Sequence, residues 1–460
     1  MLLLSSCATS GSKGLDASNI QIPANWHQAD EAVQVVDDGG DLSQWWTQFG
    51  DPTMDQLIGQ ALTNNPTLKI ALLNVETARA QKGIASSALW PSLDAGLSSG
   101  GTRTDDLKNN SSSSSESYGA SLSASWEIDL FRKQANTIQS AEAELRASEQ
   151  DFHAAQVMLA VEVAESYLGF RSLQQEYGIV STSIGLREET LQITRWQEEA
   201  GDASILEVQQ AIVSLEQARI SLPSMEQDME ETLNSLAILC GDTPGSLHNL
   251  LKKDAQLPEV PSEIKCEIPA QILDQRPDIK AARLRVESAT STLSAAEKER
   301  LPSLTLAGSI RLDEESFSDL LDPTKLVSSL IGNLTAPIWN AGRIGKQIEL
   351  EDINLRKTYI AYEDQVLEAL SEVENALSAI VKAAREIELT QTATEAARLS
   401  AEIAEQQFEA GDVDLLSVLE SQRSYQSLEQ SLVGAHIKQL NAHIQLYRAM
   451  GGGWSVPASI

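Results

Sequence analysis

The sequence is poor in cysteine, in aromatic residues and in positive charge. Its three cysteines, Cys7, Cys240 and Cys266, are too few and too scattered for a disulfide framework, and no Cys-x-x-Cys or Cys/His cluster offers a zinc site. Aromatic residues make up only 5% of the chain. The 34 Lys and Arg against 66 Asp and Glu give 34 − 66 = −32. That charge repels phosphate backbones and anionic lipid headgroups, so we expect no nucleic acid partner.

Long apolar runs and catalytic motifs are missing as well. The longest apolar runs fall short of the ~18 to 20 residues that a transmembrane helix needs, so any membrane span must be built from strands. There is no Gly-rich phosphate loop and no His-Glu-x-x-His. The glutamate pairs are consecutive, so their side chains point in different directions around a helix and do not form a catalytic dyad. The sequence therefore predicts no enzyme activity, no metal site and no cofactor.

The amino terminus reads as the end of a lipoprotein signal. Residues 4–7, Leu-Ser-Ser-Cys, resemble the bacterial lipobox, in which the cysteine takes the lipid. Six residues are too few for a complete signal peptide, so either the sequence is shortened or its start lies upstream. We expect residues 1–6 to be a signal remnant, Cys7 to be lipidated, and residues 7–52 to form an N-terminal arm.

The rest of the chain contains one duplication. The segment 65–69 (NPTLK) returns as 276–280 (RPDIK), and 90–93 (WPSL) returns as 301–304 (LPSL), both at an offset of 211. Further matches lie at an offset of 210: Ala200-Gly201-Asp202 with Ala410-Gly411-Asp412, and Cys240-Gly241 with Met450-Gly451. A register held this closely predicts two similar halves, residues 53–263 and 264–454, followed by a tail, 455–460.

Each half has the pattern of long helices. Apolar residues in the second half step by three and four, as in a helix packed along a neighbour: Tyr359, Tyr362, Val366, Leu370, Val373, Leu377 and Ile380. We predict helices at about 53–88, 133–200, 203–240, 277–299, 344–410 and 413–449. Two of them approach seventy residues, or about 100 Å. The hairpins 133–240 and 344–449 are far longer than a compact enzyme needs, and Pro223 is expected to kink the third helix.

Each half also has two strand-like stretches around a polar loop, forming β-hairpins at 93–128 and 303–338. In the first, strands at 93–102 and 118–128 flank a loop at 103–117; in the second, strands at 303–312 and 326–338 flank 313–325. One face is apolar and the other carries small polar residues, which fits a membrane barrel with a wet interior. Four strands do not close a barrel, so the chain must pool its strands with copies of itself. Three copies give 3 × 4 = 12 strands.

Four separated motifs resemble the NodT-type branch of the outer membrane factor family. They are Trp45-Trp46-x-x-Phe49-x-Asp51-Pro52, Leu239-Cys240-Gly241-x-x-Pro244-Gly245, the segment 272–279 (ILDQRPDI) and Gly451-Gly452-Gly453-Trp454. The resemblance implies a mainly α fold with a small β part: a homotrimer with a transmembrane β-barrel and a long periplasmic α-helical barrel. It departs at Arg132, where many relatives carry Gly; the equivalent position of the second half keeps Gly342.

The candidate site residues lie near the ends of the two long helices. Gly201 and Gly411 are each followed by Asp, Asp202 and Asp412, so we predict two helical hairpin tips with Gly ending one helix and Asp capping the next. By motif position, the resemblance implies that Glu207 and Glu420 are pore-facing acids. Arg423 lies three residues after Glu420, close enough on a helix to interact. Glu207, Glu420 and Arg423 are therefore a candidate periplasmic gate.

The resemblance implies an outer-membrane exit duct of a tripartite multidrug efflux system. The chain would be lipid-anchored and passive, fed by a periplasmic adaptor (membrane fusion) protein and by an inner-membrane pump that we expect to be proton-driven. Two alternatives stay open. One is an outer-membrane duct for polypeptide secretion. The other is a periplasmic coiled-coil scaffold or adaptor without a channel.

Overall fold

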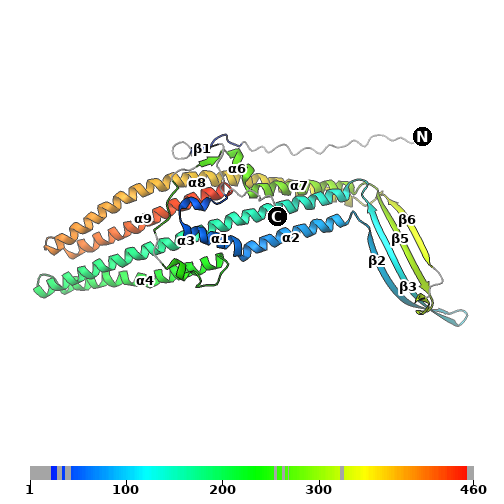
Figure 1. Ribbon diagram of the computed structural model, residues 1–460, viewed down its shortest axis with the longest axis horizontal. Coiled ribbons are helices and arrows are strands. Elements are labelled where there is room, and N and C mark those ends of the chain that lie inside the picture. Colours follow the sequence, from blue (N-terminus) through cyan, green and yellow to red (C-terminus); the bar gives the residue numbers. More distant parts are fainter. Residues whose placement is uncertain are drawn as a thin grey trace. The chain divides into compact units, whose positions relative to one another are not determined.

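The computed structural model describes residues 22–27, 34–36, 43–252, 256–261, 265–267, 269–321 and 326–452. Helices dominate (Figure 1). The α-helices are α1 Pro52–Asn64, α2 Pro66–Ser87, α3 Lys133–Ala200, α4 Ile205–Leu239, α5 His248–Leu251, α6 Pro269–Gln275, α7 Pro277–Lys298, α8 Arg343–Glu409 and α9 Leu415–Ala449. The strands are β1 Gln34–Val36, β2 Ser92–Asp106, β3 Ser111–Ile128, β4 Lys265–Glu267, β5 Ser303–Glu314 and β6 Val327–Thr335. Short 3₁₀ helices cover Trp45–Phe49 and Asp319–Leu321.

The chain divides into two units. The first combines residues 1–72, 150–280 and 363–460, and the second combines 73–149 and 281–362. None of the helices in the described ranges combines the length and the apolar character needed to cross a membrane.

The first unit is built on two long helical hairpins, α3–α4 and α8–α9 (Figure 1). The step of three and four predicted for α8 is confirmed from Val366 to Ile380, because Val366, Val373, Leu377 and Ile380 are buried and Leu370 packs against the same core. Tyr359 and Tyr362, at the start of the predicted step, are only half-buried. The large core also takes in α1 and the segment before it. Trp45 stacks on Tyr447 of α9 with ring centroids 5.4 Å apart. The N-terminal tryptophan motif therefore packs against the end of α9.

The predicted helix at 53–88 is wrong in one respect, because it is two helices. Asp51 caps α1 by accepting hydrogen bonds from the backbone N–H groups of Thr53 and Met54, at 2.8 and 3.2 Å. The chain then breaks at Asn65, and Pro66 opens α2. Proline lacks the N–H that a continuous helix would need, but it fits the first turn of a new one.

The second unit carries a four-stranded antiparallel sheet in the order β2-β3-β5-β6. The predicted polar loops are wrong in extent. Pairing continues to Asp106 opposite Ser111, so the first hairpin turns over four residues only, and β5 runs to Glu314. Serine-rich segments have little intrinsic strand preference, and the pairing partner decides here.

The register sorts the sheet into two faces. Leu93, Ala124, Gly308 and Leu330 lie in line across the four strands, and the next residues, Asp94, Ser123, Ser309 and Ser329, form the adjacent line. Successive residues of a strand point to opposite faces, so one face is apolar and the other is polar. The Oγ atoms of Ser309 and Ser329 are 2.8 Å apart on the polar face.

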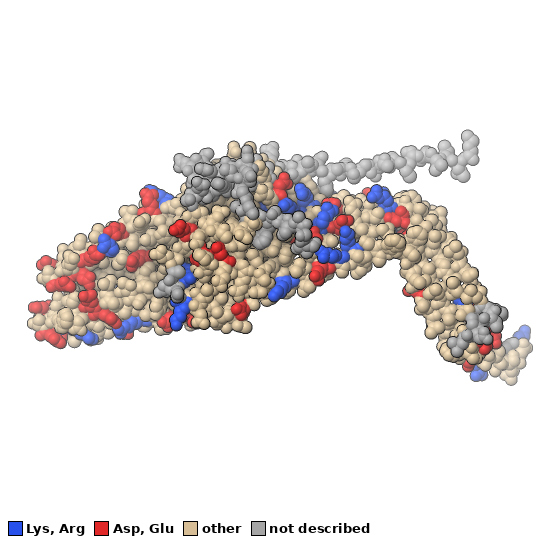
Figure 2. Space-filling model, in the orientation of Figure 1, with Lys and Arg blue, Asp and Glu red and all other residues tan. Residues whose placement is uncertain are grey.

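None of the described residues covers the apolar face. The side chains of Leu97 and Leu330 are 84% and 82% exposed. Figure 2 shows the sheet as mostly free of charge on the visible side, with charged side chains gathered at one end. Arg103, Asp105 and Asp313 lie at that end. The sheet thus has an uncharged belt that the protein leaves exposed.

Candidate functional site

The two helical hairpin tips have the same backbone geometry. Gly201 and Gly411 end α3 and α8 with φ of +88° and +78°, the left-handed region that glycine adopts without strain. The N–H of Gly201 donates to the Glu198 carbonyl at 3.0 Å, and the N–H of Asp202 donates to the Gln197 carbonyl at 2.8 Å. Gly411 and Asp412 repeat both bonds with Phe408 and Gln407, at 3.0 and 2.8 Å. This pair of bonds is the Schellman motif.

The predicted capping role of Asp202 and Asp412 is wrong. Because their N–H groups complete the Schellman turn, the next helix starts two residues later. Ser204 caps α4 in a capping box with Glu207, whose carboxylate accepts from the Ser204 N–H at 2.6 Å and from its hydroxyl at 2.8 Å. Asp414 caps α9 and accepts from the N–H of Ser417 at 3.0 Å.

These caps set the charge at the tips. The hydrogen bonds from the Ser204 N–H and hydroxyl lower the pKa of Glu207, and the negative charge of Asp414 opposes that shift. The hydroxyl and N–H of Ser417 likewise lower the pKa of Asp414. The carboxylates of Glu207 and Asp414 are therefore both anions near neutral pH, and they lie close enough to repel each other. Figure 2 shows acidic side chains over this end of the hairpins.

Glu420 and Arg423 are both exposed on α9. No ion pair between these two side chains is found within the described ranges, although three residues separate them. The structure thus leaves both charged groups accessible near the tip. Glu207 differs from them, because its carboxylate is already engaged by Ser204.

A small apolar core ties the two hairpins together beside the tips. It joins α3 and α4 to α8 and α9 through Leu191, Val208, Ala211, Leu215, Phe408, Leu415 and Val418. Polar bonds reinforce it: Gln197 donates to the Phe408 carbonyl at 3.2 Å, and Gln422 donates to the Thr190 hydroxyl at 3.0 Å. Any separation of the hairpins must break these contacts.

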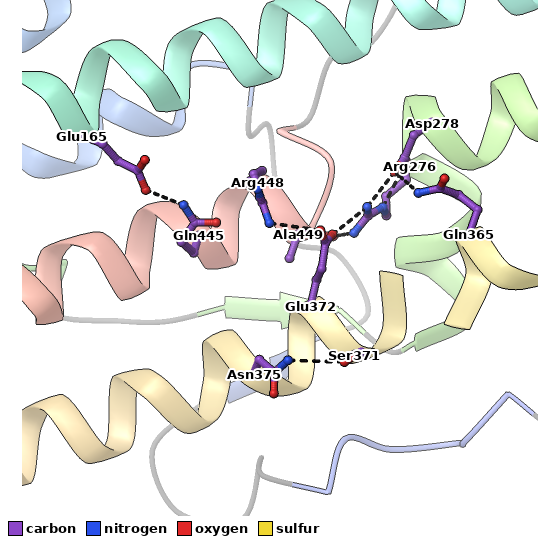
Figure 3. A network of polar contacts seen from close by, with 10 residues as sticks. All are labelled: Glu165, Arg276, Asp278, Gln365, Ser371, Glu372, Asn375, Gln445, Arg448 and Ala449. Atoms are coloured by element: carbon purple, nitrogen blue, oxygen red, sulfur yellow. Dashed lines mark hydrogen bonds and ion pairs between the residues drawn. The ribbon is translucent and has the colours of Figure 1, made fainter. Parts of the chain in front are cut away.

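A second polar centre surrounds Arg276 (Figure 3). This arginine belongs to the motif at 272–279, and the sequence predicted no role for it. Its guanidinium is held by Asp278 through Nε at 3.1 Å and Nη2 at 2.7 Å, and by Glu372 at 2.8 Å. Its Nη1 donates to the Ala449 carbonyl, the last of α9, at 2.8 Å. Arg448 also pairs with Glu372 at 3.0 Å. One buried guanidinium therefore connects α7, α8 and α9.

The duplication offered a signal for this centre. Asn65, 211 residues before Arg276, donates from Nδ2 to the carbonyl of Leu239, the last residue of α4, at 2.8 Å. In the first half, the residue before the proline of α2 thus donates to the last carbonyl of α4. In the second half, the residue before the proline of α7 donates in the same way to the last carbonyl of α9. Among the described residues no group of three or more His, Cys, Asp or Glu side chains forms a metal site.

Comparison with known proteins settles the family. The outer membrane efflux protein family matches residues 57–242 and 268–452, most of the chain. The chain belongs to this family. It is 30% identical to the pyoverdine export outer membrane protein OpmQ of Pseudomonas aeruginosa, over 98% of this chain and 95% of that protein. It is 31% identical to the toluene efflux pump outer membrane protein TtgC of Pseudomonas putida, over 94% and 90% of the two chains.

Solved structures of the family agree. The outer-membrane channel OprN superimposes with a TM-score of 0.83 at 25% identity, over 95% of this chain and 99% of that one. CusC, described as forming a transmembrane channel, superimposes with a TM-score of 0.79 at 25% identity, over 95% and 99%. The mainly α fold with a small β part is confirmed. The chain is an outer-membrane efflux channel protein, as the motifs indicated.

The predicted lipidation site lies outside the residues that the structure describes. Cys7 and residues 1–6 lie beyond the described ranges, as do Trp454 and the tail 455–460. A relative from Salmonella typhimurium, 28% identical over 92% of this chain and 90% of its own length, is named a probable outer membrane lipoprotein, SilC.

Proposed function

We propose that three copies of this chain form a passive exit duct whose inner end is opened and closed by the helical hairpin tips. The observation that carries the proposal is the sheet. It has an uncovered apolar face, a polar face and two edge strands, β2 and β6. Open strand edges are not tolerated in lipid, so neighbouring copies must pair them.

The length of the strands supports a position in the outer membrane. On β3, Trp126 lies near the end of the strand and Tyr118 lies eight residues before it on the same face, about 26 Å away along the strand at about 3.3 Å per residue. Outer-membrane barrels carry an apolar band of about 25 Å between two aromatic girdles. Trp90 and Trp339, 74% and 88% exposed, flank the strands at the end where Trp126 lies. We therefore assign these aromatic side chains to the membrane interfaces.

The two halves of the chain, residues 53–263 and 264–454, would each supply one strand hairpin and one helical hairpin. Trimerisation turns Glu207, Asp414 and Glu420 into three rings of acids at the tips, with Arg423 as the nearby cation. Exposed ion pairs contribute only ~0 to 1 kcal/mol each, so closure would be a sum of weak contacts. A periplasmic adaptor that docks on the tips could offset that sum.

The partners and cargo follow the family. The chain would act with a periplasmic adaptor and a proton-driven inner-membrane pump, and would break no bond itself. Relatives are named for export of pyoverdine and of toluene, so we propose small organic molecules as cargo. Lipid on Cys7 would anchor the N-terminal arm, and mass spectrometry of protein from the full-length gene tests it. Unmodified Cys7 in that protein would rule out the anchor.

Single-channel conductance of the variants tests the gate. Replacing Arg423 by Ala removes the cation between acidic rings, so conductance should rise, and replacing Glu420 by Gln should reduce cation selectivity. The matched control is Arg385→Ala, because Arg385 is an exposed α8 arginine paired with Glu388 away from the tip. If Arg423→Ala and Glu420→Gln both behave like Arg385→Ala, these two residues are ordinary surface charges.

A further inference from the structure

Arg187 of α3 is a buried cation that pairs with no carboxylate of the described residues. The residue is 8% exposed. Its Nη1 donates to the Ser214 carbonyl at 3.0 Å, and its Nη2 donates to Oε1 of Gln426 at 2.7 Å. Both acceptors are neutral. Its Nε is buried and has no hydrogen-bond partner among the described residues.

The surroundings of Arg187 differ from those of the buried arginine described above. Arg276 is 5% exposed and pairs with both Asp278 and Glu372. A buried charge without an opposite charge nearby is strongly unfavourable. Either the site around Arg187 is strongly unfavourable, or a group outside this chain supplies the missing negative charge.

A cavity of about 340 Å³ adjoins Arg187 and has room for such a group. It lies between α3, α4 and α9. Its lining is Val180, Arg187, Gln217, Ala218, Ser221, Met225, Arg423, Gln426, Ser427 and Gln430. The lining contains two arginines, three glutamines and two serines, and no Asp or Glu. At roughly 30 Å³ per water, the cavity is large enough for a small anion and several waters.

The second arginine strengthens the positive character of the cavity. Burial lowers the pKa of Arg187, and the nearby charge of Arg423 lowers it further. The side chain of Arg423 is exposed, so the cavity can be reached from solvent. The guanidinium groups of Arg187 and Arg423 repel each other across the cavity, and an anion bound between them would offset that repulsion.

Three carboxylates close in sequence to the lining residues bind other partners. Glu188, which follows Arg187, pairs with Arg219. Glu226 of α4 accepts from the hydroxyl of Tyr177 at 3.0 Å, and Glu429 of α9 accepts from the hydroxyl of Tyr425 at 2.6 Å. None of these three acids lines the cavity. The neutralising group is therefore not supplied by these neighbours.

We propose that this cavity is a binding site for a small oxyanion, a phosphate or a carboxylate, held between Arg187 and Arg423. The guanidinium of Arg187, which lines the cavity, donates to one oxygen, and the guanidinium of Arg423 donates to another. Gln217, Gln430 and the serine hydroxyls offer further donors. The site shares Arg423 with the gate proposed above, but it needs only the packing of α3, α4 and α9 in one chain and not the trimer.

Isothermal titration calorimetry of the purified full chain in detergent tests the site, with inorganic phosphate and sodium acetate as probes at constant ionic strength. We expect saturable binding of at least one probe at one site per chain. Arg423→Gln, an exposed position that should not disturb folding, should weaken binding by about tenfold or more, the effect of losing one charged hydrogen bond. Arg187→Lys keeps the charge but loses the planar guanidinium and its several donors, and should weaken binding to a similar degree.

Arg385→Gln is the control, because it removes an exposed arginine of α8 outside the cavity and should bind like the wild type. Thermal melts of each variant verify folding. The proposal is overturned if the wild type binds neither probe, which would place a carboxylate of a neighbouring chain in the cavity or leave it empty. It is equally overturned if Arg423→Gln and Arg187→Lys bind as tightly as the Arg385→Gln control.

Discussion

Asn65 and Arg276 occupy the same position in the two halves of the chain, and each donates a hydrogen bond to the last carbonyl of a returning helix. The acceptors are Leu239 and Ala449, both at 2.8 Å. The second half adds charge to the arrangement, since Arg276 also binds Asp278 and Glu372. The duplication thus kept the geometry and changed its chemistry from an amide to a guanidinium.

Replacing Arg276 by Met should destabilise the protein strongly. The change leaves two carboxylates without their cation and the Ala449 carbonyl without its donor, which costs about 3 kcal/mol or more. Arg385→Met breaks an exposed pair instead and should cost less than about 1 kcal/mol. Thermal denaturation followed by circular dichroism compares the two variants. Equal melting temperatures would show that the Arg276 centre contributes little.

Two glycines with positive φ should differ in their tolerance of alanine. Gly201, with φ of +88°, has no atom within 4 Å of an added Cβ. Gly241, with φ of +72°, would place its Cβ 2.5 Å from the Asn64 carbonyl oxygen. Gly201→Ala should therefore cost only the left-handed backbone, about 1 kcal/mol, whereas Gly241→Ala adds a clash of about 1 to 3 kcal/mol. Unfolding in guanidinium measures both, and an equal loss would contradict the packing around Gly241.

Arg132 is a strained position whose equivalent in the second half is a glycine. Arg132 has φ of +64°, and Gly342, its equivalent, has φ of +85°. A side chain in the left-handed region costs about 1 to 2 kcal/mol, partly offset by the smaller unfolded-state entropy of a non-glycine residue. Arg132→Gly should therefore stabilise by about 0.5 to 1 kcal/mol and Gly342→Ala should destabilise, as read from melting temperatures. If Arg132→Gly is instead less stable than the wild type, the contacts of the arginine side chain outweigh the strain of its left-handed backbone.

Acid should weaken the first unit through His443. This residue is 2% exposed, and burial lowers its pKa below the ordinary value of 6.5. Because the folded chain binds this proton less readily than the unfolded chain, the contribution is complete above pH 6.5 and is lost as the pH falls towards the folded pKa. Stability measured from pH 8 down to pH 5 should fall less in His443→Gln than in the wild type. Parallel curves for the two proteins would show that His443 does not titrate between the two states.

Much of the fold could be predicted because long helices repeat a simple pattern. The positions of α3, α4, α8 and α9 were predicted to within about two residues from heptad spacing and from glycines at the hairpin tips. β2, β3 and β5 were predicted too short, because pairing extends β3 through Ser111–Ser115, whose own preference is weak. β6 was predicted too long, since it ends at Thr335 and not at residue 338. The caps were misplaced, because a Schellman turn uses the N–H groups of Asp202 and Asp412.

The sites that escaped prediction depend on segments far apart in the sequence. Arg187 donates a hydrogen bond to Gln426, 239 positions away, and Arg276 pairs with Glu372 and donates to the carbonyl of Ala449. Periodicity reports which face of a helix is buried, but it does not report which polar side chain crosses to another helix. The family resemblance singled out Glu207 by its motif position, and the carboxylate of Glu207 completes a capping box with Ser204.

The most direct test of the account is the current through the purified wild-type protein in a planar lipid bilayer. A trimeric duct with acidic tips should give discrete conductance steps, and under a salt gradient its reversal potential should show a preference for cations. The complete absence of steps, from protein that is trimeric by native mass spectrometry, would contradict the claim that this chain forms the conduit.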